Sequence, residues 1–298
     1  MTRGQVGRPG LATGLHRPVG TMSAALYGEL HPHPWRDPET TQDAYILFHD
    51  RSLAMGWLDD LGGTVRITAG GVEERPTGGP GLWGMNDAGQ DHPLALPESS
   101  LVAWFQVGVE PVTGDRPLPV QPFLRCAADT VTRIGGLHLR AVQLLLPVQG
   151  IDASARPAYA ELPALRTAGW FSGGDPRART RVRVILDSGQ DPSIRMAAPR
   201  MRERMGRLEQ EVFACESLSH EDPADDDPLA SRPPFEDHFW NGPARYRATL
   251  HGTLAEWSPD ALGWLGGLLA DLAARHGITT PLLLTATRLE PAPTESRR

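Results

Sequence analysis

The feature that most constrains the fold of this 298-residue chain is a plan of predicted elements that occurs twice, once in each half. An Asp-Pro pair follows Trp35 and precedes the apolar segment 43–50, and another follows Trp170 and precedes segment 181–188. Each opening leads into the same predicted order: strand, helix, strand, a long insertion with a tryptophan, then strand, helix and strand. The repeated order therefore predicts a fold made of two similar halves.

The periodicity of apolar residues supports the individual elements of this plan. Segments 101–109 and 246–254 alternate along one face, which is typical of strands with one buried side. Segments 122–134 and 259–276 repeat apolar residues at helical spacing, begin at a proline and are followed by glycine. The remaining predicted helices are 52–61 and 199–210, and the remaining predicted strands are 43–50, 64–69, 139–146, 181–188, 211–218 and 282–289.

The order β-α-β-β-α-β in each half is that of a ferredoxin-like unit. We predict an α+β protein of two tandem ferredoxin-like halves that arose by internal duplication. In such a unit the helices cover one face of the sheet and leave the other face open. Two open faces in one chain can pack face to face around a pocket. The alternative is one continuous α/β sheet built from the same units.

The same reading divides the chain into five segments. Residues 1–30 are expected to be a disordered N-terminal tail, and residues 31–148 form the first ferredoxin-like half. A linker over 149–168 leads to the second ferredoxin-like half at 169–290. Residues 291–298 are expected to be a disordered C-terminal tail.

Composition excludes several classes of protein. The net charge of -7 argues against a nucleic-acid partner, because phosphate binding needs a basic surface. No apolar run reaches the roughly 18 residues of a membrane span, and the first residues lack the apolar core of a signal peptide. Two cysteines, Cys126 and Cys215, make no disulfide framework. We therefore expect a cytoplasmic protein without a membrane partner.

All 29 basic residues are arginine, which is typical of a GC-rich bacterial coding bias. Without lysine there is no Schiff base to a carbonyl or to pyridoxal phosphate, no P-loop lysine and no lysine general base. The motifs CxxC, HExxH and GxSxG are also absent from the sequence. The sequence therefore indicates no cofactor.

Two segments have residues of the kind that bind metals. His31 and His33 lie one residue apart in an extended, proline-flanked segment, but no third ligand stands nearby in the sequence. The acidic run at 221–227 lacks the alternating ligands and central glycine of an EF-hand loop. We predict no metal site from either segment.

Strand alternation supplies the candidate site. If the apolar positions of segments 181–188 and 246–254 face the helices, their polar positions share the open face of the sheet. Arginine pairs there suit a carboxylate or phosphate group, and a histidine can transfer a proton near neutral pH. The predicted catalytic residues are His251 and His49, and the predicted substrate-binding residues are Arg181, Arg183, Arg247, Thr249, Thr253, Trp83, Trp104 and Trp240. The alternative is a solvated sheet face whose arginines serve solubility.

These observations leave three functional hypotheses open. The first is a small-molecule-binding protein of bacterial metabolism that acts as a cofactor-independent acid-base enzyme on an anionic or carbonyl substrate. The second is a non-catalytic scaffold or protein-binding assembly component, with a homo-oligomer among its forms. The third is a degenerate duplicate in which one half is structural and the other is active.

Overall fold

The computed structural model describes residues 20–37, 42–59, 64–68, 71–75, 81–92, 94–95, 100–112, 116–152, 161–220, 234 and 236–290. The elements up to residue 150 are β1 (Gly20–Pro32), α1 (Ala44–Ala54), β2 (Thr64–Thr68), β3 (Gly71–Arg75), β4 (Asn86–Gly89), β5 (Leu101–Val109), α2 (Val120–Ile134), β6 (Gly135–Leu146) and the 3-10 turn η2 (Val148–Gly150). The later elements are η3 (Pro163–Phe171), η4 (Pro176–Ala178), β7 (Thr180–Asp187), α3 (Ser193–Met205), β8 (Phe213–Ser219), η5 (Asp237–Phe239), β9 (Arg247–Leu254), α5 (Pro259–Arg275) and β10 (Leu282–Arg288).

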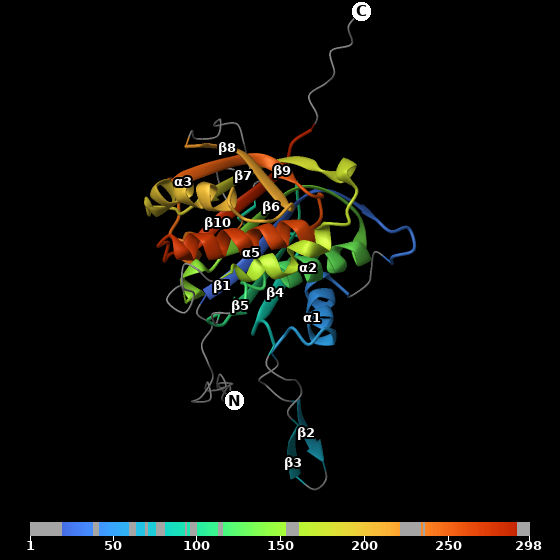
Figure 1. Cartoon of the computed structure of the whole chain (residues 1–298). Coiled ribbons are helices and arrows are strands. Elements are labelled where there is room, and N and C mark those ends of the chain that lie inside the picture. The colour runs from blue at the N-terminus through green and yellow to red at the C-terminus, as the bar shows by residue number, and fades with distance from the viewer. Residues whose placement is uncertain are drawn as a thin grey trace, which may run out of the picture.

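The protein is a mixed α+β structure built on one eight-stranded antiparallel sheet with the order β4-β5-β1-β6-β10-β7-β9-β8 (Figure 1). The strands β2 and β3 form a separate two-stranded hairpin. The last strands of the two halves, β6 and β10, pair with each other. Their register runs from Leu146 opposite Leu282 to Ala141 opposite Thr287. The expectation of two sheets packed face to face is therefore wrong, because this pairing joins both halves edge to edge in a single sheet.

The strands of the two halves follow the same spatial order. The main-sheet strands β1, β4, β5 and β6 lie as β4-β5-β1-β6, and the strands β7, β8, β9 and β10 lie as β8-β9-β7-β10. We number the four main-sheet strands of each half along the chain. From the outer edge of the sheet inward, both halves then have the order second, third, first and fourth strand. Each half thus reaches the junction between β6 and β10 in the same way.

The helices cover one face of the sheet (Figure 1). Helices α2 and α5 pack against each other, α1 packs beside α2, and α3 packs beside α5. Helix α5 begins where the Ser258 side chain accepts a hydrogen bond from the Ala261 backbone and Pro259 takes the first helical position. It is buried almost throughout, because it packs on the sheet, α2, α3 and η3. We call the opposite side of the sheet the helix-free face.

The first half departs from the sequence prediction at its start. Residues 20–30, assigned to a disordered tail, belong to β1 (Gly20–Pro32), a central strand between β5 and β6. Segment 43–50, predicted as a strand, instead belongs to α1, whose N-cap Asp43 accepts a hydrogen bond from the Ile46 backbone at 2.9 Å. Its buried residues Ala44, Leu47 and Phe48 follow helical spacing. The terminal segments 1–19 and 291–298 lie outside the described residues.

The insertion of the first half also differs from the prediction. Segment 64–69 was expected to be a strand of the main sheet, but β2 pairs only with β3 in the separate hairpin. The short strand β4 takes the edge position instead and pairs with β5 from Asn86–Val107 to Gly89–Trp104. The second half follows the prediction more closely, but α3 spans Ser193–Met205 rather than the predicted 199–210. Among the described helices none is long and apolar enough to cross a membrane.

Candidate functional site

Polar side chains are buried at the centre of the helix-free face. The Tyr27 hydroxyl of β1 donates to Gln143 Oε1 of β6 at 2.6 Å, and Gln143 Nε2 donates to Thr285 Oγ1 of β10 at 3.3 Å. All three residues are at most 3% exposed. Burial raises the pKa of Tyr27, so this hydroxyl stays protonated and remains a donor. The three side chains link the two halves across the junction between β6 and β10.

A segment of the second half covers this centre, and we call residues 236–246 the strap. Trp240 of the strap is fully buried and packs on Ala25, Tyr27, Ala141, Leu145 and Leu283 of the three central strands. The strap is held where Gln190 donates from its backbone to the Asn241 carbonyl at 2.9 Å and from Nε2 to the Pro243 carbonyl at 2.8 Å. Trp240 was predicted to bind the substrate, but it forms part of the core.

Strands β7 and β9 place four predicted residues together beside the strap. Arg181 lies opposite Thr253 and Arg183 lies opposite His251 in the antiparallel register. Such cross-strand neighbours have Cβ atoms about 5 Å apart, and successive residues on one face lie about 6.7 Å apart. Arg181 is exposed and the other three are half-buried. We call these four residues the cross-strand set.

Two members of the cross-strand set have side chains that the protein leaves available. Within the described ranges, neither the Arg181 guanidinium nor the His251 imidazole has a hydrogen-bond or ion-pair partner. Ser217 of β8 extends the set, because it lies opposite His251 on the other side of β9. Sequence alternation missed this serine because an irregularity between Cys215 and Ser217 shifts the parity of β8.

Arg247 and Thr249 lie on the same face but have different surroundings. Arg247 Nε lies 2.7 Å from Asp187 Oδ2, and the Asp187 side chain is almost fully buried. Burial raises the pKa of Asp187, whereas hydrogen bonds from Arg247 and from the Gly189 backbone lower it. Arg247 therefore neutralises Asp187 rather than offering its charge to a ligand. Thr249 is only 5% exposed.

The other predicted site residues lie elsewhere. His49 is on α1, because segment 43–50 is helical. Trp83 is buried on the helix side, where its ring packs against Trp57 and Phe123. Trp104 does lie on the helix-free face, but five strand spacings separate it from β9, or about 24 Å. The predicted single pocket containing all ten residues therefore does not form.

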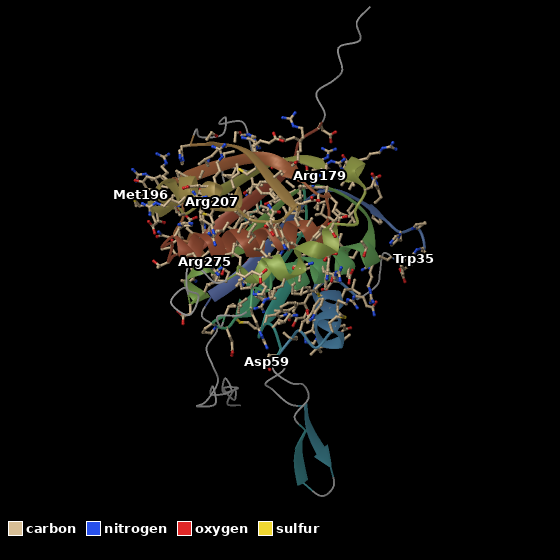
Figure 2. The ribbon with its side chains drawn as sticks, viewed as in Figure 1. Trp35, Asp59, Arg179, Met196, Arg207 and Arg275 are labelled. Atoms are coloured by element: carbon tan, nitrogen blue, oxygen red, sulfur yellow. The ribbon has the colours of Figure 1, made fainter. Side chains whose placement is uncertain are left out.

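His31 lies near the end of β1, and His33 follows just beyond that strand. His33 Nε2 lies 2.8 Å from the Thr132 carbonyl, and its ring stacks on Trp35 at 4.8 Å. Trp35 itself stands on the surface at the far end of β1 (Figure 2). Among the described residues, no group of three or more His, Cys, Asp or Glu side chains could hold a metal ion. The acidic run at 221–227 lies outside them.

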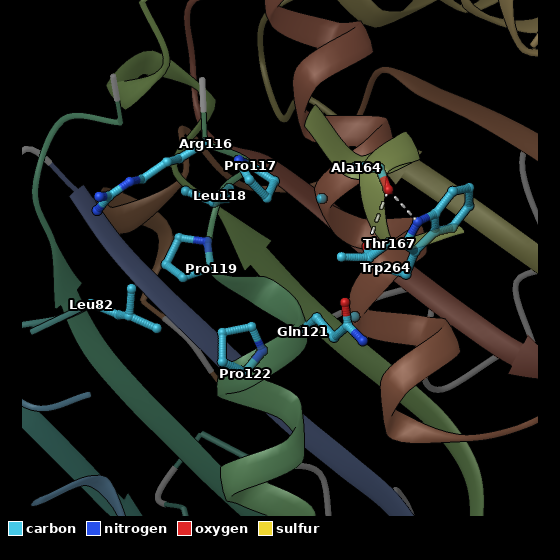
Figure 3. Close-up of a pocket in the computed structure, with 12 residues that line it drawn as sticks. Leu82, Arg116, Pro117, Leu118, Pro119, Gln121, Pro122, Ala164, Thr167 and Trp264 are labelled. Carbon is cyan, nitrogen blue, oxygen red and sulfur yellow. Dashed lines mark hydrogen bonds between the residues drawn. The ribbon is translucent and has the colours of Figure 1, made fainter. Parts of the chain in front are cut away.

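A cavity of about 240 Å³ lies on the helix side, between the start of α2, the middle of α5 and η3 (Figure 3). No residue of the cross-strand set lines it. The molecule thus has a polar candidate site on one face of the sheet and an apolar cavity on the other. No protein-family model, curated protein or solved structure matches this chain.

Proposed function

We propose that this protein binds a small molecule with a carboxylate or phosphate group at the cross-strand set of β7 and β9. The observation that carries the proposal is the register that places Arg181 opposite Thr253 and Arg183 opposite His251 on the helix-free face. Two arginines, a histidine and a threonine are thus neighbours on one face, within reach of a single anionic group. Guanidinium forks bind such groups through paired, charge-assisted hydrogen bonds.

Local charge supports this proposal. The chain has a net charge of -7, so a general surplus of arginine does not account for a positive region. Of the helix-free positions of β7 and β9, all of which are described, Asp187 alone is acidic. Its charge is balanced by Arg247 at 2.7 Å. The other charged residues of the two strands on this face are Arg181 and Arg183, which favours an anionic ligand.

The same set supports proton transfer to a bound substrate. His251 lies between Arg183 of β7 and Ser217 of β8 in the sheet register. A histidine beside an anion-binding arginine can serve as acid or base, while the arginine holds the substrate. We therefore keep the acid-base enzyme acting on an anionic or carbonyl substrate as the catalytic form of this proposal, with His251 as the proton donor or acceptor.

We also propose that the two halves are ferredoxin-like units that arose by internal duplication. The shared spatial order of their strands supports this origin. In the duplication β1 corresponds to β7 and β5 to β9. Over residues 23–27 of β1 and 104–106 of β5, the positions on the helix-free face are Ser23, Ala25, Tyr27, Trp104 and Gln106, without an arginine or a histidine. The second half would then be the active one and the first half structural.

Calorimetric titration with inorganic phosphate and with succinate tests the binding proposal. We expect saturable binding of at least one probe, and Arg183→Gln should weaken it by about tenfold or more, since a charge-assisted hydrogen bond contributes about 1.5–3 kcal/mol. Arg200→Gln is the matched control, because Arg200 is exposed on α3. Absence of binding, or equal weakening by both variants, would contradict the proposal.

Native mass spectrometry of the freshly purified chain separates the binder from the scaffold. A small mass that is retained by the native protein and lost on denaturation favours the binding function. A homo-oligomer or a co-purified polypeptide without such a mass favours an assembly component. Retention of the small mass by the wild type and its loss in Arg183→Gln would place the ligand at the cross-strand set.

A further inference from the structure

The cavity on the helix side has a wall composition that selects its occupant. Figure 3 shows the rings of Pro117, Pro119 and Pro122 along one side and Ala164, Thr167 and Trp264 along the other. Leu82, Leu118 and two glycines of α5, Gly263 and Gly267, complete most of the lining. The three prolines bring no backbone N–H group to the wall. The cavity is thus lined mainly by carbon.

The polar groups of this wall are already paired within the protein. Trp264 Nε1 donates to the Ala164 carbonyl at 2.7 Å, and Thr167 Oγ1 donates to the same carbonyl at 3.2 Å. Gln121 Nε2 donates to Asp260 Oδ1 at 3.4 Å. The Arg116 side chain extends along the rim, away from Trp264 (Figure 3). A charged ligand inside the cavity would lose its water and gain few hydrogen bonds in return.

One glycine keeps the cavity open. A Cβ atom on Gly267 would lie 3.6 Å from the Leu118 carbonyl oxygen and 3.9 Å from Pro117 Cβ, which are ordinary contact distances. Alanine would therefore fit there, and it favours a helix interior over glycine by about 1 kcal/mol. Gly263, one turn earlier, has a different reason to be glycine, since its Cβ would lie 2.4 Å from Gln121 Cα. Close packing therefore explains why residue 263 is a glycine, but it does not explain the glycine at position 267.

We propose that this cavity is a second binding site, for a small uncharged apolar molecule of the size of one ring or two fused rings. Apolar cavities of about 150 Å³ already accept benzene, and sites for drug-sized ligands start near 300 Å³. The cavity of about 240 Å³ falls between these sizes. The proposal is independent of the anion site, because the two sites lie on opposite faces of the sheet and share no residue.

Indole is the probe for this site, and its binding to the full chain can be measured by ligand-observed NMR or calorimetry. We expect saturable binding of one equivalent. Gly267→Leu should abolish it or weaken it at least about tenfold, because the added side chain occupies the cavity. Indole-3-carboxylate should compete poorly for the indole site, since its charge would be desolvated without a partner.

Gly267→Ala keeps the test decisive if the leucine variant does not fold. Its methyl group meets only ordinary contacts, so we expect a folded protein with an increased melting temperature and weaker indole binding. The proposal is overturned if the wild type shows no saturable indole binding. It is also overturned if the folded Gly267 variants bind indole as the wild type does, or if the carboxylate competes as well as indole itself.

Discussion

The two faces of the sheet differ in how they are closed, and the difference determines what each can bind. On the helix side one apolar core runs across the sheet from β4 to β8 and packs against the helices. On the helix-free face the apolar cluster is small and centred on Trp240 of the strap. Strand β9 shows both sides at once: Ala248 and Leu250 are buried among the helices, whereas His251 is partly accessible.

This contrast separates two kinds of recognition. Polar groups around the helix-side cavity are paired with one another, as Trp264 and Thr167 are through the Ala164 carbonyl. On the helix-free face, Arg181 and His251 lie beside the closed centre without a partner among the described residues. An apolar molecule suits the first environment and an anion suits the second. A single chain can thus hold two sites with little overlap in ligand chemistry.

The largest effect is expected from removing the residue that closes the helix-free face. Trp240→Ala should destabilise the fold by about 3–5 kcal/mol, because it removes a fully buried indole and leaves a cavity over three strands. Urea denaturation measures this change. Trp170→Ala is the matched control, and it should change the unfolding free energy by less than about 0.5 kcal/mol because Trp170 is 69% exposed.

A small loss of unfolding free energy in Trp240→Ala would contradict this description of the two faces. If both tryptophan variants unfold at the same urea concentration as the wild type, the strap contributes no core. The helix-free face would then be open across all central strands, and Tyr27 and Gln143 would lie at the surface.

Substitutions at two glycines of α5 test whether the helix-side cavity is open. Gly263→Ala should destabilise the protein by about 1–3 kcal/mol, because its methyl group would overlap Gln121 of α2. Gly267→Ala should stabilise it by up to about 1 kcal/mol, because the methyl group enters the cavity and favours the helix. Thermal unfolding of the two variants and the wild type measures both changes. Equal effects would mean that the cavity is not open at Gly267.

The second half could be predicted well because its patterns are local. Alternation in β9 and the Ser-Pro-Asp start of α5 specify those elements from adjacent residues. The same alternation assigned Arg183 and His251 to one face, and the register between β7 and β9 makes them neighbours. When one face of a strand is uniformly apolar, the alternate residues are identified as those that point away from the core.

The first half could not be predicted as well because its patterns are ambiguous. Strand β1 is buried on both faces over residues 22–28, so it lacks alternation. Segment 43–50 mixes aromatic and aliphatic residues that suit either a strand or a helix. The apparent match between segments 43–50 and 181–188 therefore pairs a helix with a strand. The closure of the face by Trp240 depends on tertiary packing that periodicity does not report.

The smallest effect concerns two histidines, one on each side of the sheet. Burial lowers the pKa of His276 at the end of α5, and Arg200 and Arg204 of α3 lower it further. Burial also lowers the pKa of His92, whose ring lies 4.9 Å from that of Trp104, but Glu236 and Asp87 oppose the shift. The charges around His276 reinforce the effect of burial, whereas those around His92 counteract it.

A lowered histidine pKa makes stability depend on pH in a defined direction. Unfolded His276 takes up a proton near its ordinary pKa of 6.5, before the folded form does, so protonation favours unfolding. The contribution of His276 is therefore complete above this value and is lost as the pH falls through the folded pKa. Between about pH 7.5 and about pH 5.5, His276→Gln should lose less stability than the wild type, and His92→Gln should differ from the wild type by less. Parallel profiles for His276→Gln and the wild type in urea denaturation would show that neither burial nor the arginines of α3 lower the pKa of His276. A larger change for His92→Gln than for His276→Gln would show that the charges around His92 do not counteract its burial.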